Sequence, residues 1–458
     1  MKSIWAVSRT MIIEVIRMKG LQLFLAIFTL MYTVGFAFWL QSTGGFVNEK
    51  VQTFISYSLS ILVTTLSFLT IFISIHSISR DLKNKEIYSI TTKPISRCGY
   101  MFGKILGMVL LNCFWLIMSG VIIYGISVGL GEYGSFNQTR GFIKTNEVDK
   151  DTLRQFVYVA RQSVKSVKAN NHQEALAVAN KVVKEMVQVE KITDGEHIKQ
   201  LRNKIYVDKI IELDKRGVSV DQGRNQLWHF KDIKVPNIKN GVVTIRYRME
   251  ASSNPVDQKM HGIWLVGPED PIVNGGMQIS TYDSIRTVHE FSISADTVSE
   301  NGELYVAFKN SVENGAISVI FPRHNGFEIL YSIDTYEANF VRTMLVIFIR
   351  LIFLSILGVA VGGWLSFPVA ALFALVLFIL SLSHGFIDSA MSGALGRYLF
   401  LIPNFAYFDP ILDFEKGRIV PWAFVGKAFI SLAIIKGGII YLIGYGIFKF
   451  RELARVIV

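Results

Sequence analysis

The chain is poor in charge and in cysteine. Only 18% of its 458 residues are charged, against about 25% in a soluble domain, which excludes a protein that is soluble along its whole length. The two cysteines are Cys98 and Cys113, so no disulfide is expected in residues 131–340. The eight histidines form no HExxH pair, and no Cys/His cluster has zinc spacing. We therefore expect no zinc site.

Motifs of soluble enzymes are also lacking. The chain has no GxSxG sequence, and residues 99–105 resemble a P-loop only with too few residues between the glycines and with Ile105 where Ser or Thr should hold Mg²⁺. Four acidic residues that could suggest calcium have no ligand spacing and fit turns better: Asp257, Glu269, Asp270 and Asp283. We expect no catalytic residue and no cofactor or metal bound by this chain itself.

The net charge of +11 is unevenly distributed. Residues 1–130 and 341–458 hold 21 of the 47 Lys and Arg and 9 of the 36 Asp and Glu, a net of +12. Residues 131–340 hold the remaining 26 and 27, a net of −1. The basic excess therefore lies beside the apolar runs, as in a membrane protein. A nucleic-acid partner is not expected, because the polar central block has no basic surplus.

What the chain has instead is long apolar runs. A helix needs about 20 apolar residues to cross a bilayer, and Gly362, Gly363 and Pro368 divide the longest run in two. The sequence predicts an α-helical polytopic membrane protein with six spans, three on each side of residues 131–340: 23–40, 51–79, 105–131, 343–362, 367–385 and 428–448.

Basic segments indicate the orientation. They precede the first span, separate the second from the third, and follow the sixth. With six spans, all three lie on one side, which should be the cytoplasm. Both termini are then cytoplasmic, and residues 131–340 form a domain on the outer side. The loop between spans four and five has no basic residue, which makes this hairpin the weakest part of the topology.

Residues 1–22 form a separate feature. Ile4, Trp5, Met11 and Val15 fall on one broad helical face, and Glu14 lies opposite. This pattern predicts an amphipathic helix in the inner membrane interface. An ordinary basic tail before the first span is the alternative.

The outer block, 131–340, has two patterns. Apolar residues recur at three- and four-residue spacing over about 147–216, which predicts helices. Eight short alternating segments over about 226–334 predict strands. We expect an inserted α+β domain with a helical part and a β-sandwich, in the form of a jelly roll. Trp228 and Trp264 could stack on a sugar ring, but aromatic residues more often fill such a core.

Two cations interrupt the apolar runs. Arg350 lies in the fourth span and Lys436 near the centre of the sixth. A charge at mid-bilayer costs about 2.5–3.5 kcal/mol on insertion scales, so it usually faces a bundle interior or a water-filled path. One prediction is that one or both line a translocation path or bind an anionic substrate head group. The other is that they extend to the membrane surface.

The segment between spans two and three, residues 79–104, is dense in charge of both signs. It has an apolar stripe that ends at Pro94. This composition fits a helix on the membrane surface that binds a cytoplasmic partner, and a solvated basic loop is the alternative. The candidate docking residues are Arg80, Asp81, Lys83, Glu86, Pro94 and Arg97.

This segment resembles the cytoplasmic coupling region of type-2 ABC exporter permeases. In that family an acidic residue and a small or hydroxyl stretch precede a P-I-S-R element and a G-K pair at the start of the third helix. Here these are Glu86, 89–92, 94–97 and 103–104. The six spans, the amphipathic first helix and the basic end of the chain are also similar. The 200-residue outer block departs from a simple member and leaves the substrate class open.

The resemblance implies transport without chemistry in this chain. A separate cytoplasmic ABC ATPase would bind ATP and Mg²⁺, and a second permease copy or paralogue would complete a dimer in the bacterial cytoplasmic membrane, in contact with membrane lipid. Residues 386–423 would form a re-entrant outer segment, with Asp388 and Arg397 near an outer gate; a plain outer loop is the alternative. The rival function is a membrane-anchored receptor or scaffold whose β-sandwich binds a carbohydrate.

Overall fold

The structure, a computed structural model, describes most of the chain. The described residues are 2–18, 32–41, 46–84, 96–133, 135–137, 141–166, 171–190, 198, 201–209, 218–235, 241–322, 326–383 and 402–450. They form two compact units. The helical unit consists of Met1–Ala160 and Asp334–Val458, and the β unit is Arg161–Ile333. Each unit is described by itself.

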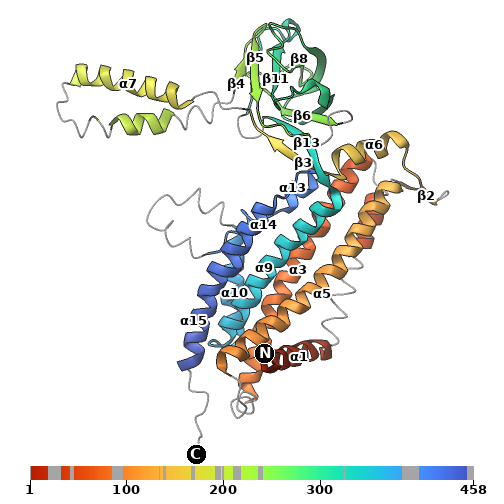
Figure 1. The fold of residues 1–458 in the computed structure, drawn as a ribbon, viewed down its shortest axis with the longest axis vertical. Helices are drawn as coiled ribbons and strands as arrows, with labels where there is room; N and C mark the ends of the chain where they lie inside the picture. The colour runs from red at the N-terminus through yellow and green to blue at the C-terminus, as the bar shows by residue number, and fades with distance from the viewer. Residues whose placement is uncertain are drawn as a thin grey trace, which may run out of the picture. The chain divides into compact units, whose positions relative to one another are not determined.

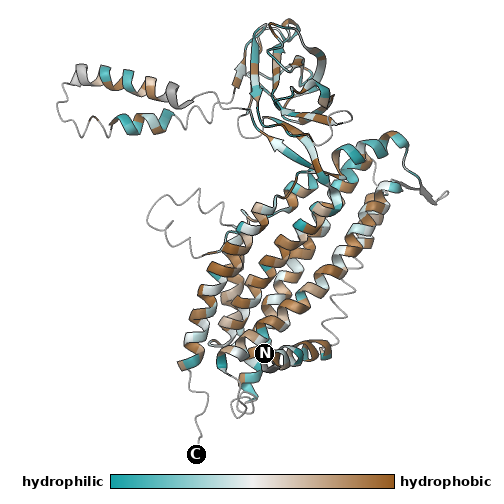
Figure 2. Cartoon of the chain, in the orientation of Figure 1, coloured by the Kyte–Doolittle hydropathy of each residue, from teal (hydrophilic) through white to brown (hydrophobic). Residues whose placement is uncertain are grey.

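The helical unit is a bundle of long apolar helices (Figures 1 and 2). Its N-terminal half contains α1 (Lys2–Arg17), a helix over 32–41, α3 (Val47–Lys83) and α5 (Arg97–Glu132). Its C-terminal half contains α9 (Tyr336–Gly362), α10 (Phe367–Leu382), α13 (Ile411–Glu415), α14 (Trp422–Ala428), the π-helix η4 (Phe429–Lys436) and α15 (Gly437–Phe450). Strands β1 (Ser135–Asn137) and β2 (Gly141–Ile143) and helix α6 (Glu147–Phe156) also belong to this unit.

Among the described residues, four helices are long and apolar enough to cross a membrane. They are α3, α5, α9 and the continuous helix Trp422–Phe450 formed by α14, η4 and α15. The predicted turn between 343–362 and 367–385 is confirmed, since α9 ends at Gly362 and α10 begins at Phe367. At 16 residues, α10 is shorter than these four. The first predicted span, 23–40, lies partly outside the described residues, and 32–41 is helical.

Helix α9 occupies the centre of the bundle. It packs against α3, α5, α10 and α15. Polar groups also join the helices there: the Asn112 amide donates to Ser355 Oγ at 3.2 Å, and Thr70 Oγ1 donates to Asn112 Oδ1 at 2.9 Å. These three residues come from α5, α9 and α3. Hydrogen bonds of this kind fix the register of packed apolar helices.

The β unit contains all eight predicted strand segments. They are β5 (Asn225–Phe230), β6 (Val242–Arg248), β8 (Lys259–Gly267), β9 (Met277–Ser284), β10 (Val288–Ser294), β11 (Leu304–Asn310), β12 (Val319–Phe321) and β13 (Phe327–Thr335). Three further strands join them: β3 (Val159–Val164), β4 (Val218–Val220) and β7 (Glu250–Ala251). The sheet orders are β10-β6-β13-β3, β5-β11-β8-β9 and β4-β12-β7.

One apolar core is shared by these sheets. Trp264 on β8 lies opposite Phe308 on β11 in register, and both are fully buried. Ile245 on β6 and Ile329 on β13, from the other four-stranded sheet, belong to the same buried cluster. The alternation of apolar and polar residues that predicts the strands therefore also turns their apolar faces toward a common interior.

The predicted helical part, 147–216, is only partly helical, and this corrects the sequence prediction. Helix α6 ends at Phe156, α7 covers Asn171–Glu190, and 201–209 is helical. Between α6 and α7 the chain forms β3, which pairs with β13 at the edge of its sheet. The apolar spacing over 152–167 suits a helix, but pairing with a neighbouring strand outweighs this local preference.

Candidate functional site

Helix α1 packs closely against the start of α5. Val7, Ser8 and Met11 are buried on the face of α1 that meets Gly103 and Gly107 of α5. A Cβ at Gly103 would lie 2.8 Å from Val7 Cβ, and one at Gly107 would lie 2.9 Å from the Ser8 carbonyl oxygen. The two glycines are four residues apart and share a helix face. They give α1 a groove that larger residues would fill.

This packing buries an ion network between three helices. Glu14 of α1 is 6% exposed, and its Oε2 lies 3.3 Å from Lys104 Nζ of α5. Lys104 Nζ also lies 2.8 Å from Asp81 Oδ2 and donates to Ser77 Oγ at 2.7 Å, both on α3. The Tyr100 hydroxyl donates to Asp81 Oδ2 at 2.5 Å. One ammonium therefore holds two carboxylates from different helices.

Arg80 completes the charge balance of the network. Its Nη2 lies 2.9 Å from Glu14 Oε1, an ion pair without hydrogen-bond geometry. Two cations, Arg80 and Lys104, thus face two anions, Glu14 and Asp81. Burying a charge is costly unless it is paired and hydrogen-bonded. The network is therefore internally compensated, and loss of one member leaves another uncompensated.

The network lies where α3 ends and α5 begins. Arg80 and Asp81 lie in the last turn of α3, and Tyr100 and Lys104 lie in the first turns of α5. The chain between these two helix ends is residues 84–96. The network therefore ties both ends of this segment to each other, and Glu14 ties them to α1. A displacement of the segment would reach three helices at once.

The structure places four of the six predicted docking residues. Arg80 and Asp81 face the network, Lys83 is exposed at the end of α3, and Arg97 donates to the Lys449 carbonyl oxygen at 2.5 Å, at the end of α15. Asp81 is 4% exposed, so it is bound inside the protein rather than offered to a partner. Glu86 and Pro94 lie outside the described residues.

The helix bounds also differ from the sequence prediction. Residues 79–83 continue α3 and 97–104 begin α5, so neither part forms a separate surface helix. The ion pairs explain this difference, because they satisfy Arg80, Asp81 and Lys104 inside the bundle. Ser96 caps α5 by accepting a hydrogen bond from the Gly99 backbone N–H at 3.0 Å.

Glu14, Ser77, Tyr100 and Lys104 are absent from the sequence-predicted site. Two signals could have indicated them. Glu14 is the only acidic residue of the otherwise apolar and basic stretch 2–20, and Lys104 directly precedes an uncharged run. The sequence does not show that α1 and α3 both pack against α5, and this packing brings positions 14, 81 and 104 together.

Arg350 and Lys436, the predicted path residues, lie in the C-terminal half. Arg350 is 8% exposed, with its guanidinium carbon 4.5 Å from the ring centroid of Phe405 and 5.2 Å from that of Phe378. Its guanidinium is thus enclosed by aromatic rings. Lys436 Nζ donates to the Ile402 carbonyl oxygen at 2.8 Å. The two cations make no direct contact in the structure.

The two predicted ligand aromatics are interior residues. Trp264 is 0% exposed and Trp228 is 7% exposed. Their ring centroids lie 6.4 Å apart, and Phe321 and Phe327 pack against both. Neither indole offers a face to a sugar, because each is covered by core side chains.

The predicted outer gate and re-entrant segment can be compared only in part. Asp388 and Arg397 lie outside the described residues. In the described part of 386–423, the chain makes a short helix, α13, and Asn339 of α9 donates to the Arg418 carbonyl oxygen at 2.8 Å. Within the described ranges, no group of three or more His, Cys, Asp or Glu residues is placed to hold a metal ion.

The contact of α1 with α5 gives a first prediction. Gly103→Leu is expected to cost about 1–3 kcal/mol, because the new side chain overlaps Val7 and forces α1 away. Gly125→Leu, on the same helix, is the matched control, since nothing lies within 4 Å of its Cβ position. Thermal unfolding of both purified variants in detergent measures the difference. Equal melting temperatures would contradict the close packing.

No family model, curated protein or solved structure matches this chain.

Proposed function

We propose that this chain is the permease subunit of an ATP-driven ABC exporter and works with a separate cytoplasmic ATPase. The observation that carries the proposal is the buried network of Glu14, Arg80, Asp81 and Lys104. It joins both ends of the segment 84–96, the segment that resembles a coupling region, to α1. A force applied to this segment would be passed to α1, α3 and α5 together.

The proposed topology has six spans with both termini in the cytoplasm. Four are the long apolar helices α3, α5, α9 and Trp422–Phe450. The remaining two are α10 and the run 23–40, of which 32–41 is helical. The basic segments then share the cytoplasmic side, and the β unit is extracytoplasmic. Its two four-stranded sheets with a common core support a β-sandwich.

The transport mechanism needs no chemistry in this chain. ATP binding and hydrolysis, with Mg²⁺, belong to the partner ATPase, and a second permease copy or paralogue would complete the path. Arg350, enclosed by Phe378 and Phe405, and Lys436 lie on helices of the C-terminal half, where they could meet an anionic cargo. A plain membrane anchor has no need of such buried cations.

The receptor alternative is weaker. Its support is the pair Trp228 and Trp264 as sugar-stacking residues, and both indoles are buried in the core of the β unit. An anchor also has no need of a buried ion network at the end of its helices. Both features favour a protein in which the helices themselves carry out the function.

Co-purification of an ATPase tests the proposal. The full-length chain is purified from its native membrane, and recovery of an ABC ATPase is compared with that of the variant Glu86→Gln/Arg97→Gln. We expect the variant to recover at least about tenfold less, because charged contacts of about 1.4 kcal/mol or more would be lost. Lys427→Gln, exposed on α14, is the matched charge control.

The possible results separate the two functions. Loss of the ATPase from the double variant, with normal recovery from Lys427→Gln, supports the coupling assignment. Equal recovery from the double variant and the unaltered chain would refute the role of the segment. Absence of any ATPase from the unaltered chain would reject the exporter and favour the receptor.

A further inference from the structure

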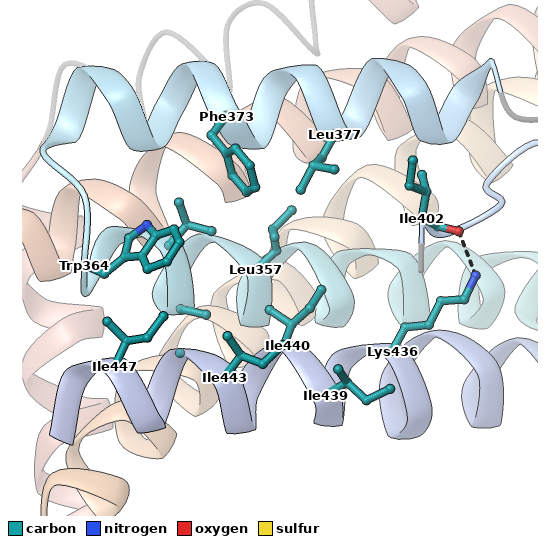
Figure 3. A pocket seen from close by; sticks show the side chains of 13 residues that line it. Leu357, Trp364, Phe373, Leu377, Ile402, Lys436, Ile439, Ile440, Ile443 and Ile447 are labelled. Carbon is teal, nitrogen blue, oxygen red and sulfur yellow. Dashed lines mark hydrogen bonds between the residues drawn. The ribbon is translucent and has the colours of Figure 1, made fainter. Parts of the chain in front are cut away.

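An apolar pocket lies between α9, α10 and α15 in the helical unit. Its volume is about 260 Å³, and Figure 3 shows the side chains that line it. Of the 13 lining residues, twelve are apolar or glycine and one, Lys436, is charged. They are Leu357, Ala360, Val361, Trp364, Phe373, Leu377, Ile402, Lys436, Ile439, Ile440, Ile443, Gly444 and Ile447.

The pocket has two chemically different ends. In Figure 3, Lys436 and Ile402 lie at one end, and Trp364 and Ile447 lie at the other. Lys436 and Ile447 are separated by eleven residues of helix, which corresponds to about 16 Å at about 1.5 Å per residue. The walls between the ends are formed by Leu357, Leu377 and Ile440. The pocket is therefore elongated, apolar along its length and cationic at one end.

The helix that carries Lys436 is irregular at this point. Residues Phe429–Lys436 form the π-helix η4, and the α-helical pattern resumes at Gly437. A π-helix is rare and occurs frequently at functional sites. Here it ends at Lys436, the residue that supplies the charge and whose Nζ donates to the Ile402 carbonyl oxygen at 2.8 Å.

The pocket is also accessible from outside the bundle. Phe373 is 43% exposed, Ile443 57% and Trp364 41%, so three lining side chains form a rim on the surface. All three belong to apolar helices or to the turn between α9 and α10. In a membrane this rim would contact the acyl chains of lipids, and an amphiphile could enter from the bilayer.

We infer that the pocket binds a single-chain anionic amphiphile, with its acyl chain along α9, α10 and α15 and its carboxylate or phosphate group at Lys436. The apolar walls match a hydrocarbon chain, and the ammonium matches an anionic head group. At about 260 Å³ the pocket is smaller than most sites for drug-sized ligands, which begin at about 300 Å³. It therefore has room for one acyl chain and not for the two chains of a membrane lipid. The identification of this ligand as the exported cargo rests on the proposed function. Binding of the ligand in the pocket does not depend on that function.

Photolabelling of the full-length protein tests the inference. The protein is reconstituted in zwitterionic lipid, and a fatty acid with a photoactivatable group near its methyl end is added. The uncharged fatty alcohol with the same group is the second probe. We expect the acid to label peptides of α10 and α15 and to label them about tenfold more strongly than the alcohol, because a charge-assisted hydrogen bond is lost with the alcohol.

Four variants separate the contributions of charge and shape. Lys436→Gln should abolish the preference for the acid, and Lys436→Arg should retain it. Leu377→Trp fills the pocket and should abolish labelling by both probes. Ile379→Trp, on the same helix but 56% exposed and not lining the pocket, should label like the unaltered chain.

Two results would overturn the inference. One is unchanged labelling in Leu377→Trp, which would place the probe elsewhere. The other is equal labelling by acid and alcohol in the unaltered chain, which would show that the pocket does not select an anionic head group. Labelling requires neither an ATPase nor transport, so its failure is independent of the co-purification experiment. Labelling without a co-purified ATPase would retain the ligand site and reject the exporter.

Discussion

Lys104→Met is expected to destabilise the helical unit by about 3–5 kcal/mol. Lys104 forms ion pairs with both Glu14 and Asp81. Its removal leaves two buried carboxylates, of which Asp81 loses its only cation within the described residues. Breaking a buried ion pair by removing one partner costs about this much, since the remaining charge is uncompensated. The apparent melting temperature of the detergent-purified protein should fall accordingly.

Two comparisons make this prediction specific. Lys83→Met removes an exposed lysine from the end of α3 and should change stability by no more than about 0.5 kcal/mol. The variant Lys104→Met/Asp81→Asn removes the orphaned charge of Asp81, and Glu14 keeps Arg80 as its cation, so this variant should recover most of the loss. A Lys104→Met protein that melts like the unaltered chain would show that the network is not closed as described.

Trp264→Ala is expected to destabilise the β unit by a similar amount. Its indole is 0% exposed and packs against the rings of Tyr247 and Phe308, at centroid distances of 4.6 and 4.8 Å. Removing a buried aromatic side chain costs about 3–5 kcal/mol, because transfer free energy is lost and a cavity remains. Limited proteolysis of the full-length protein, followed over temperature, reports opening of this unit.

An exposed aromatic residue provides the control. Tyr282 is 44% exposed and stacks on His261 at a centroid distance of 4.1 Å. Tyr282→Ala should cost only about 1 kcal/mol, the value of one aromatic pair. If Trp264→Ala instead left stability unchanged and abolished binding of a sugar, the receptor function would gain the support that the buried position denies it.

Several elements could be predicted from the sequence because local patterns determine them. The eight strands over 226–334 follow from alternation of apolar and polar residues, and each predicted segment overlaps a strand of the structure. The turn between α9 and α10 follows from Gly362, Gly363 and Pro368. Strand β3 could not be predicted, because its residues have helical spacing and only the adjacent β13 makes them a strand.

The candidate site could likewise be predicted from the sequence only in part. Charge density between the second and third runs identified Arg80 and Asp81, but it suggested that their side chains face a partner. The structure turns Asp81 inward to Lys104 and Tyr100. Sequence spacing cannot give that direction, since the contact requires the end of α3 and the start of α5 to pack together.

The sequence by itself determined that the chain has long apolar helices, that its basic excess lies beside them, and that a neutral β-rich block separates the two halves. These are sums and periodicities along the chain, and they need no tertiary contact. Only the tertiary structure decided which charges are buried together and which aromatic residues are interior. Glu14, Asp81 and Lys104 are up to 90 positions apart, and packing of three helices brings a carboxylate oxygen of Glu14 and one of Asp81 within 3.3 Å of Lys104 Nζ.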